Sequence, residues 1–176
     1  MTPWKQHVEN WSGCTRCALS SSRKRVVLAR GKLPCDVLFV GEAPGDSEDV
    51  LGKPFVGPAG HLLDYMIERA IGGRDLRIAF TNVIGCIPKE AGTKANEPPK
   101  WAIQECAPRL AEFVAIACPR LTFNVGRISE KHGPKGVGLV HPAAILRGDP
   151  VGQEIVIQRT IVTIRDSVEE VFGEVY

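Results

Sequence analysis

The stretch DVLFVGEAPGDSEDVLGKPFVGPAG, residues 36–60, decides the fold of this chain. Its first part, DVLFV (36–40), is apolar at nearly every position, as the buried strands of parallel sheets are. The part that follows, 41–60, is rich in glycine, proline and carboxylates and is longer than the roughly 2–6 residues of an ordinary connection. A long loop at the end of a buried strand is a common place for chemistry, so we expect part of a functional site here.

The whole chain has 176 residues, of which 44% are hydrophobic. This composition predicts one domain, residues 1–176, with a full hydrophobic core, and it excludes a disordered chain. The net charge of +2 is too weak to indicate a nucleic-acid partner and does not oppose one. The first residues, MTPWKQHVENW, lack the apolar core of a signal peptide, and no stretch approaches the length of a membrane span. We therefore expect a cytoplasmic protein that does not enter a membrane.

Apolar patterns on both sides of the loop predict alternating strands and helices. Strands are expected at 25–29, 36–40, 77–83, 120–126 and 136–140. Helices are expected at 3–11, 59–70, 98–117 and 154–172. Pro108 costs the third of these helices a hydrogen bond, so a kink or break is expected there. The alternation predicts an α/β three-layer sandwich with a mainly parallel central sheet flanked by helices.

The tail of the chain, 154–172, carries two conflicting signals. Its β-branched content favours a strand. Its apolar residues recur at helical spacing: Ile157, Ile161, Ile164, Val168 and Val171. We follow this period and predict a helix.

Six cysteines are present: Cys14, Cys17, Cys35, Cys86, Cys106 and Cys118. In a reducing compartment, cysteines are more often metal ligands or core residues than disulfides. Cys35 and Cys118 are flanked by apolar residues and prolines, so we expect both in the core.

The other four cysteines have a spacing that suits a metal centre. Cys14 and Cys17, in CTRC, can reach one metal from a single tight turn. Cys86 follows the strand at 77–83, and Cys106 lies on the next helix, so all four can converge on one site. The alternative is a redox pair with two scattered core cysteines. Zinc and an iron–sulfur cluster both accept four thiolates, so the spacing leaves the metal open.

Polar side chains follow three of the predicted strands. Glu42 begins the long loop, Asn82 ends the strand at 77–83, and His141 begins HPAAILR after the last strand. The carboxyl ends of parallel strands share one edge of a sheet, so these residues and Phe55 can meet there. A planar base needs a ring to stack on and an amide at its edge, and an imidazole can stabilise charge on its carbonyl oxygen. Each residue alone is more typical of a turn or of the core, and only their common location indicates a site.

Several motifs together resemble those of the iron–sulfur uracil-DNA glycosylases, the family-four branch of the uracil-DNA glycosylase superfamily. They are GEAPGDSED, GKPFVGPAG with LLD, TNV with its cysteine, CTRC, and HPAAILR, and they extend from Cys14 to about Arg147. The resemblance implies a monomeric DNA-repair enzyme that flips uracil out of single- or double-stranded DNA and hydrolyses its N-glycosidic bond. It also implies a [4Fe–4S] cluster that ties the N-terminal segment to the domain through Cys14, Cys17, Cys86 and Cys106.

The same resemblance implies roles for individual residues. The expected catalytic residues are Glu42, Glu48 and His141, and the expected substrate-binding residues are Gly41, Asp46, Phe55, Asn82 and Arg147. Phe55 would stack on the base, Asn82 would read its edge, and His141 would stabilise the departing anion. One motif carboxylate, Glu48 or Glu42, would support the sugar cation, and Ile145 or Leu146 would fill the space that the base vacates.

Two segments depart from the family pattern. The segment ISEKHGPKGVGLV, 128–140, is short for the family, which leaves base preference open. The insert KEAGTKANEPPK, 89–100, has no histidine, so the covalent bonding to DNA seen in a related branch is not expected. The alternatives are a glycosylase for another damaged base, a DNA-binding module without activity, and an electron carrier.

Overall fold

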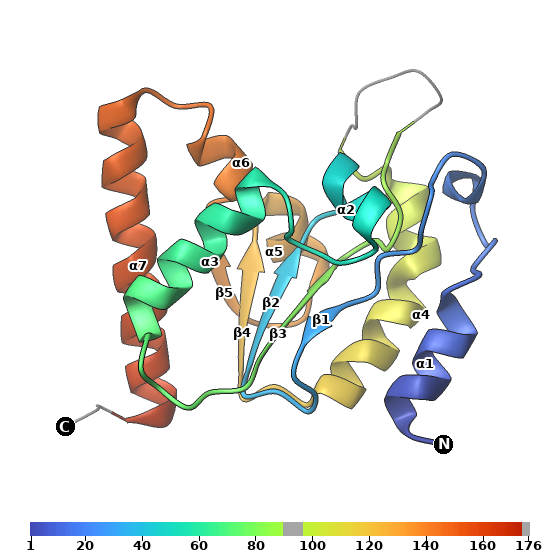
Figure 1. Ribbon diagram of the computed structural model, residues 1–176, viewed down its shortest axis with the longest axis horizontal. Coiled ribbons are helices and arrows are strands. Elements are labelled where there is room, and N and C mark those ends of the chain that lie inside the picture. Colours follow the sequence, from blue (N-terminus) through green and yellow to red (C-terminus); the bar gives the residue numbers. More distant parts are fainter. Residues whose placement is uncertain (90–96, 174–176) are drawn as a thin grey trace.

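A five-stranded sheet lies between two layers of helices (Figure 1). The structure is a computed structural model that describes residues 1–89 and 97–173. Its strands are β1 (Arg30–Gly31), β2 (Val37–Gly41), β3 (Ile78–Asn82), β4 (Leu121–Val125) and β5 (Val137–Leu139). Its helices are α1 (Pro3–Trp11), the 3-10 helix η1 (Ala18–Ser21), α2 (Asp46–Leu51), α3 (Pro58–Ile71), α4 (Lys100–Ala117), α5 (Arg127–His132), α6 (Pro142–Ile145) and α7 (Pro150–Phe172).

The order of strands in the sheet is β1-β3-β2-β4-β5. Strands β3, β2, β4 and β5 are parallel, and only the short edge strand β1 is antiparallel to its neighbour. The loops after β2, β3 and β5 therefore leave the sheet at the same edge. This arrangement confirms the predicted α/β fold with a mainly parallel sheet.

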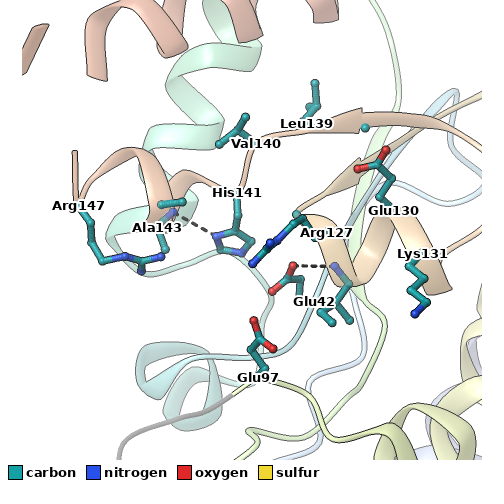
Figure 2. Close-up of a pocket in the computed structure, with 14 residues that line it drawn as sticks. Glu42, Glu97, Arg127, Glu130, Lys131, Leu139, Val140, His141, Ala143 and Arg147 are labelled. Carbon is teal, nitrogen blue, oxygen red and sulfur yellow. Dashed lines mark hydrogen bonds between the residues drawn. The ribbon is translucent and has the colours of Figure 1, made fainter. Parts of the chain in front are cut away.

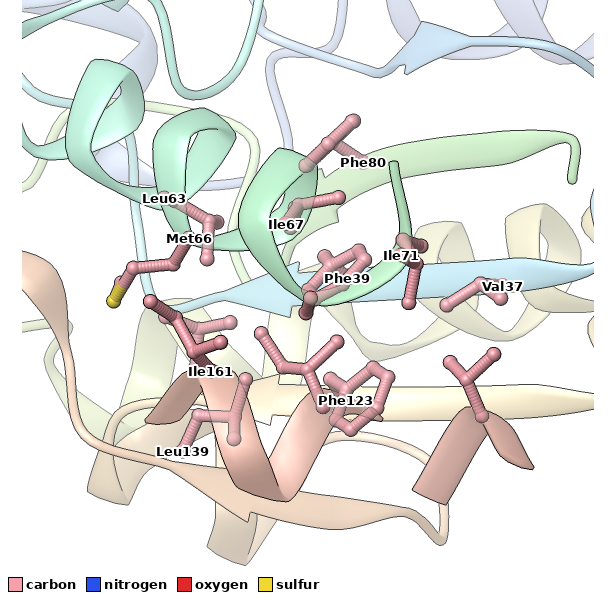
Figure 3. Packing of buried hydrophobic residues seen from close by; sticks show 14 of the residues in the cluster. Val37, Phe39, Leu63, Met66, Ile67, Ile71, Phe80, Phe123, Leu139 and Ile161 are labelled. Carbon is pink, nitrogen blue, oxygen red and sulfur yellow. The ribbon is translucent and has the colours of Figure 1, made fainter. Parts of the chain in front are cut away.

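The central strand β2 is buried on both faces. Val37 and Phe39 pack in the layer with α3, α6 and α7, and Leu38 and Val40 pack in the layer with α4. Phe39 stacks between Phe80 and Phe123 of the neighbouring strands, with ring centroids 5.4 and 5.0 Å away (Figure 3). Burying each such side chain stabilises the fold by about 1.5–3 kcal/mol, which explains why the strand has no polar face.

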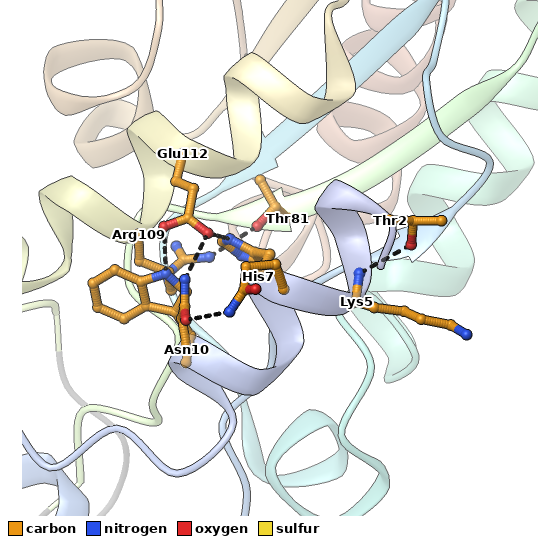
Figure 4. A network of polar contacts seen from close by, with 9 residues as sticks. Thr2, Lys5, His7, Asn10, Thr81, Arg109 and Glu112 are labelled. Atoms are coloured by element: carbon orange, nitrogen blue, oxygen red, sulfur yellow. Dashed lines mark hydrogen bonds and ion pairs between the residues drawn. The ribbon is translucent and has the colours of Figure 1, made fainter.

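The N-terminal helix α1 is held against α4 by one carboxylate. Glu112 accepts a hydrogen bond from Trp11 Nε1 at 2.9 Å and contacts His7 Nδ1 at 2.9 Å (Figure 4). Burial lowers the pKa of His7, and the Glu112 carboxylate, the next influence, raises it. This polar contact is a link between the N-terminal segment and the domain that the sequence did not indicate.

The helices predicted from apolar periodicity are confirmed in α1, α3, α4 and α7. In α7, the tail helix, Ile161, Ile164 and Val168 are buried, so the helical period prevails over β-branched content. The strand predicted at 25–29 is wrong: Val27 and Leu28 are buried, but pairing begins only at Arg30. The short helices α2, α5 and α6 were not expected, and α2 lies inside the long loop that follows β2.

Two further expectations concern α4. The break considered at Pro108 does not occur, because α4 continues through this residue, which lies on its exposed side, where water can satisfy the carbonyl left without a donor. The core position expected of Cys118 is wrong. Cys118 is exposed, because it caps α4 in the left-handed conformation at φ +46° as the chain turns outward. Cys35 is buried, as expected, and burial raises its pKa to about 11.

Most of the insert at 89–100 lies outside the described residues. Within the described part of the chain, none of the helices is both long and apolar enough to cross a membrane.

Candidate active site

A cavity of about 280 Å³ opens at the edge where the parallel strands end. Its lining includes Glu42 and Phe55 from the loop after β2, Asn82 from the end of β3, and His141 from the loop after β5. A larger cavity of about 1080 Å³ shares Glu42 and His141 with it (Figure 2). Three loops that are distant in sequence thus place a carboxylate, a ring, an amide and an imidazole around one space.

The side-chain amide of Asn82 and the ring of Phe55 both lie close to Gly41. Gly41 pairs with Asn82 in the register of β2 and β3. A Cβ atom on Gly41 would collide with the Asn82 side-chain oxygen and would lie 2.5 Å from Cζ of Phe55. Phe55 itself has φ +56°, a left-handed conformation that is uncommon for a bulky residue and typical of functional sites.

Arg30 donates hydrogen bonds to the backbone of the turn that carries Phe55. Its guanidinium donates to the carbonyl oxygens of Pro54 at 2.8 Å and Phe55 at 3.3 Å, and to the Asp64 carboxylate at 2.6 Å. The same group lies 3.7 Å from the ring centroid of Phe80. Arg30 is therefore occupied inside the fold. The sequence carried no sign of this role.

Glu48 uses both of its carboxylate oxygens to shape the loop. Oε2 accepts a hydrogen bond from the backbone N–H of Gly45 at 3.1 Å. Oε1 accepts from the N–H groups of Val56 at 2.9 Å and Gly57 at 2.8 Å. Hydrogen bonds to a charged group contribute about 1.5–3 kcal/mol each. Glu48 thus joins the start of α2 to the turn that carries Phe55.

Glu42 is bound less completely and lies between the two cavities. Its Oε1 accepts a hydrogen bond from the backbone N–H of Ile128, at the start of α5, at 3.0 Å. Its side chain packs so closely against Gly126 that a Cβ atom there would collide with the carboxylate. In the described part of the chain, its Oε2 has no hydrogen-bond partner. That oxygen can accept a hydrogen bond from a water molecule in the cavity.

His141 is held in one tautomer by the helix that follows it. It is the N-cap of α6, and its Nδ1 accepts a hydrogen bond from the backbone N–H of Ala143 at 3.1 Å. In the neutral ring the proton must therefore be on Nε2. Burial, the largest influence, lowers the pKa of His141, while the nearby Glu42 carboxylate raises it and Arg147 lowers it. The residue presents a neutral imidazole whose Nε2–H can donate.

The family model of the uracil DNA glycosylase superfamily matches residues 29–159, which include all of these cavity residues. This chain belongs to that superfamily. It is 36% identical over 119 residues to a type-4 uracil-DNA glycosylase of Sulfurisphaera tokodaii, covering 68% of this chain and 52% of the relative. It is 39% identical over 118 residues to a protein of the same name from Pyrobaculum aerophilum, covering 67% of this chain and 58% of the relative. The chain thus spans about half the length of the curated relatives it matches.

The remaining residues that the motifs indicated differ in their exposure. Asp46 is exposed and pairs with Lys89 at 3.0 Å. Arg147 is exposed and lines the larger cavity. Leu146 is 45% exposed, whereas Ile145 is 4% exposed and belongs to the core, so the expectation that Ile145 could enter DNA is wrong.

Of the four cysteines expected to bind a cluster, Cys17, Cys86 and Cys106 lie on the α4 side of the sheet. Burial raises the pKa of Cys17, and the Cys106 and Cys14 thiols raise it further. Burial also raises the pKa of Cys86 to about 12, with Cys106, Cys17 and Cys14 among the smaller influences. The four side chains are therefore close enough to affect one another. Within the described ranges, no three His, Cys, Asp or Glu side chains form a group that could hold a metal ion.

Proposed function

We propose that this protein is a uracil-DNA glycosylase that hydrolyses the bond between uracil and deoxyribose and leaves an abasic site. The observation that carries this proposal is the 280 Å³ cavity, where Phe55, Asn82, Glu42 and His141 converge. Membership of the superfamily and the printed name of the relatives support it. The substrate is uracil in single- or double-stranded DNA.

Base recognition is assigned to Phe55 and Asn82. An enzyme of this kind extrudes the base from the helix at a cost of a few kcal/mol and binds it in a pocket. The Phe55 ring stacks on the base, and the Asn82 amide donates and accepts at its edge. Gly41 contributes by having no side chain, because any larger residue would fill the space between these two groups.

His141 stabilises the leaving group. When the glycosidic bond breaks, its electron pair leaves with the base and places negative charge on the uracil oxygens. The Nε2–H of a neutral imidazole can donate a hydrogen bond to such an oxygen. The cap contact from Ala143 to Nδ1 supports this assignment, because it directs the donor away from α6.

Glu42 is the carboxylate that we assign to the sugar. It supports the positive charge that develops on deoxyribose and orients the water that attacks it. Glu48 fits this task less well, because its two oxygens already accept three backbone hydrogen bonds. Asp46 fits it less well because it is exposed and is not among the residues that line either cavity.

Contacts with the DNA outside the pocket are assigned to the end of α6. The exposed side chain of Leu146 fills the space that the base leaves in the stack, and Arg147 binds a flanking phosphate. The protein acts as a monomer in this proposal.

A [4Fe–4S] cluster bound by Cys14, Cys17, Cys86 and Cys106 completes the proposed enzyme. Four thiolates are the usual ligands of this group, and Cys106, Cys17 and Cys14 are among the neighbours that raise the pKa of Cys86. When bound, the cluster supplies a cross-link between distant segments and negative charge, since the hydrolysis transfers no electrons. Zinc is the competing metal, and the brown colour of an iron–sulfur protein distinguishes the two.

Incubation with DNA tests the function. Duplexes with one uracil opposite guanine or adenine, and the corresponding single strand, should be cut by alkali after treatment, while the thymine control stays intact. Cutting only at another damaged base would indicate a different glycosylase. Binding without any cutting would indicate a DNA-binding module.

A further inference from the structure

Ser129 carries a fully buried hydroxyl group that the proposed chemistry does not use. It lies on α5, the short helix that contributes several residues to the lining of the larger cavity, and 0% of its surface is exposed. Its Oγ donates a hydrogen bond to the main-chain oxygen of Val40 at 2.5 Å and lies 3.1 Å from Oδ1 of Asn124. Buried polar groups are costly unless they are paired, so this contact is a specific link between α5 and β2.

The hydrogen bond to Val40 lies where the sheet ends and the site begins. Val40 is the last residue of β2 that pairs with β4, and its partner in the register is Asn124. The next two residues of the chain are Gly41, which lies beside the base pocket, and Glu42, the carboxylate assigned to the sugar. Ser129 therefore holds α5 against the segment that leads directly into the site.

Asn124 supports the same helix from β4. Its side chain is buried, and its Nδ2 donates to the main-chain oxygen of Pro134, in the turn after α5, at 2.8 Å. Its Oδ1 is the second acceptor within reach of the Ser129 hydroxyl. At the start of the helix, the Gly126 N–H donates to the main-chain oxygen of Leu139 on β5 at 2.8 Å. These contacts fix α5 to β2, β4 and β5.

The position of α5 matters because the Glu42 side chain binds to its first turn. The backbone N–H of Ile128 donates to Glu42 Oε1 at 3.0 Å (Figure 2). Gly126, the N-cap of α5 with φ +99°, approaches the same carboxylate so closely that a Cβ atom would collide with it. Ile128 directly precedes Ser129, so a shift of α5 away from Val40 would also move this N–H away from Glu42.

We propose that Ser129 is a positioning residue for the Glu42 carboxylate. Its hydroxyl holds α5 against Val40, and the helix held in this way directs the Ile128 N–H at Glu42 Oε1. The carboxylate is thereby kept in one orientation beside the cavity. The proposal rests on the proposed function for the role of Glu42, whereas the link from Ser129 to Ile128 can be measured without it.

The kinetic test compares Ser129→Ala with the control Thr160→Ala. Thr160 is also buried, and its Oγ1 donates to the main-chain oxygen of Val156 at 2.8 Å in α7, a helix whose described residues line neither cavity. Ser129→Ala should lower kcat by about 10–100-fold with little change in KM, because a misplacement of about 1 Å can cost about 100-fold in rate. Thr160→Ala should keep the kcat of the parent.

A double-mutant cycle separates positioning from a general loss of stability. If Ser129 acts through Glu42, Ser129→Ala should lower kcat very little further in a protein that already carries Glu42→Ala, because no carboxylate is left to position. Independent effects would instead add in free energy. A full additional loss of kcat in the double variant would therefore overturn the proposal.

Hydrogen exchange at the Ile128 amide tests the link without catalysis. This N–H is bound to Glu42 Oε1, so its exchange should accelerate in Ser129→Ala and stay at the parent rate in Thr160→Ala. If the parent protein proves inactive on uracil DNA, this measurement still decides. Faster exchange at Ile128, with unchanged exchange in α7, supports the positioning of the Glu42 side chain, and an unchanged rate at Ile128 overturns it.

A second variant covers the case in which Ser129→Ala does not fold. Ser129→Cys places a group of similar size at the same position, but a thiol is a weak hydrogen-bond donor. It should show the same two changes, a lower kcat and faster exchange at Ile128. Parent values of both quantities in Ser129→Cys would reject the proposal.

Discussion

Gly41 and Asn82 lie opposite each other on β2 and β3, and the missing side chain of Gly41 is what allows the Asn82 amide and the Phe55 ring to reach the same space. The two strands pair because their apolar residues fill the core on both faces. The geometry of the pocket is therefore set by the register of the sheet. A shift of one residue would move Asn82 to the opposite face.

Gly41→Ala tests this relationship. The added methyl group must displace Asn82 or Phe55, because it would lie within 2.5 Å of the Phe55 ring. A misplacement of about 1 Å can cost about 100-fold in rate, so uracil excision should fall by that order. Single-turnover cleavage measures the loss. Gly13→Ala, where a Cβ atom meets nothing within 4 Å, should cleave like the parent. Equal rates in both variants would contradict the proposed pocket.

We expect Glu42→Gln to affect the catalytic rate and Glu48→Gln to affect mainly stability and substrate binding. Glu42→Gln removes the charge that supports the sugar cation, so kcat should fall by about 100-fold or more while the melting temperature stays near that of the parent. Glu48→Gln turns an amide donor toward a backbone N–H, so it should lower the free energy of unfolding by about 1–3 kcal/mol and weaken substrate binding. Thermal melts and steady-state kinetics separate the two effects. Reversed results would exchange the roles assigned here.

His141→Ala should slow bond cleavage by about 100–1,000-fold, the usual cost of losing one donor to a developing anion. Binding to the abasic product should barely change, because no base anion is present there. The pH dependence follows from the lowered pKa of His141. Because the pKa of His141 lies below the ordinary histidine value of 6.5, the ring is still neutral at pH 6.5. At lower pH the ring is protonated on Nδ1, and the hydrogen bond from the Ala143 N–H to that nitrogen is lost. The single-turnover rate should therefore decline only below pH 6.5, and a decline that begins above pH 6.5 would count against this assignment.

Cys106→Ser should abolish the brown colour and lower solubility, because it removes a ligand that joins distant segments. Cys35→Ser is the matched control. Cys35 is also buried but is not one of the four proposed ligands. Absorption spectra and iron content provide the measurement. Bleaching by Cys35→Ser with retention of colour in Cys106→Ser would show that the fourth ligand is wrong.

Local sequence patterns were sufficient for the layers of the fold. Apolar periodicity predicted α3, α4, α7 and the four parallel strands, because burial of one face or of both faces leaves a period in the sequence. It also indicated that the loops after β2, β3 and β5 share one edge, since parallel strands end together. The predicted strand boundaries were wrong where residues are buried but do not pair with a neighbouring strand, as at Val27 and Leu28.

The sequence by itself determined the α/β fold, the edge of the sheet that carries the site, and the residue types available there. Only the tertiary structure distinguishes the surroundings of Glu42 from those of Glu48, because their hydrogen-bond donors include the backbone of Ile128 and of Val56, which no local pattern assigns to them. It alone revealed Arg109 beneath Asn82, since a charged residue on a helix reads as solvent-exposed until its neighbours in space are known. Periodicity encodes which faces are buried, whereas the partner of a polar group depends on how distant segments pack.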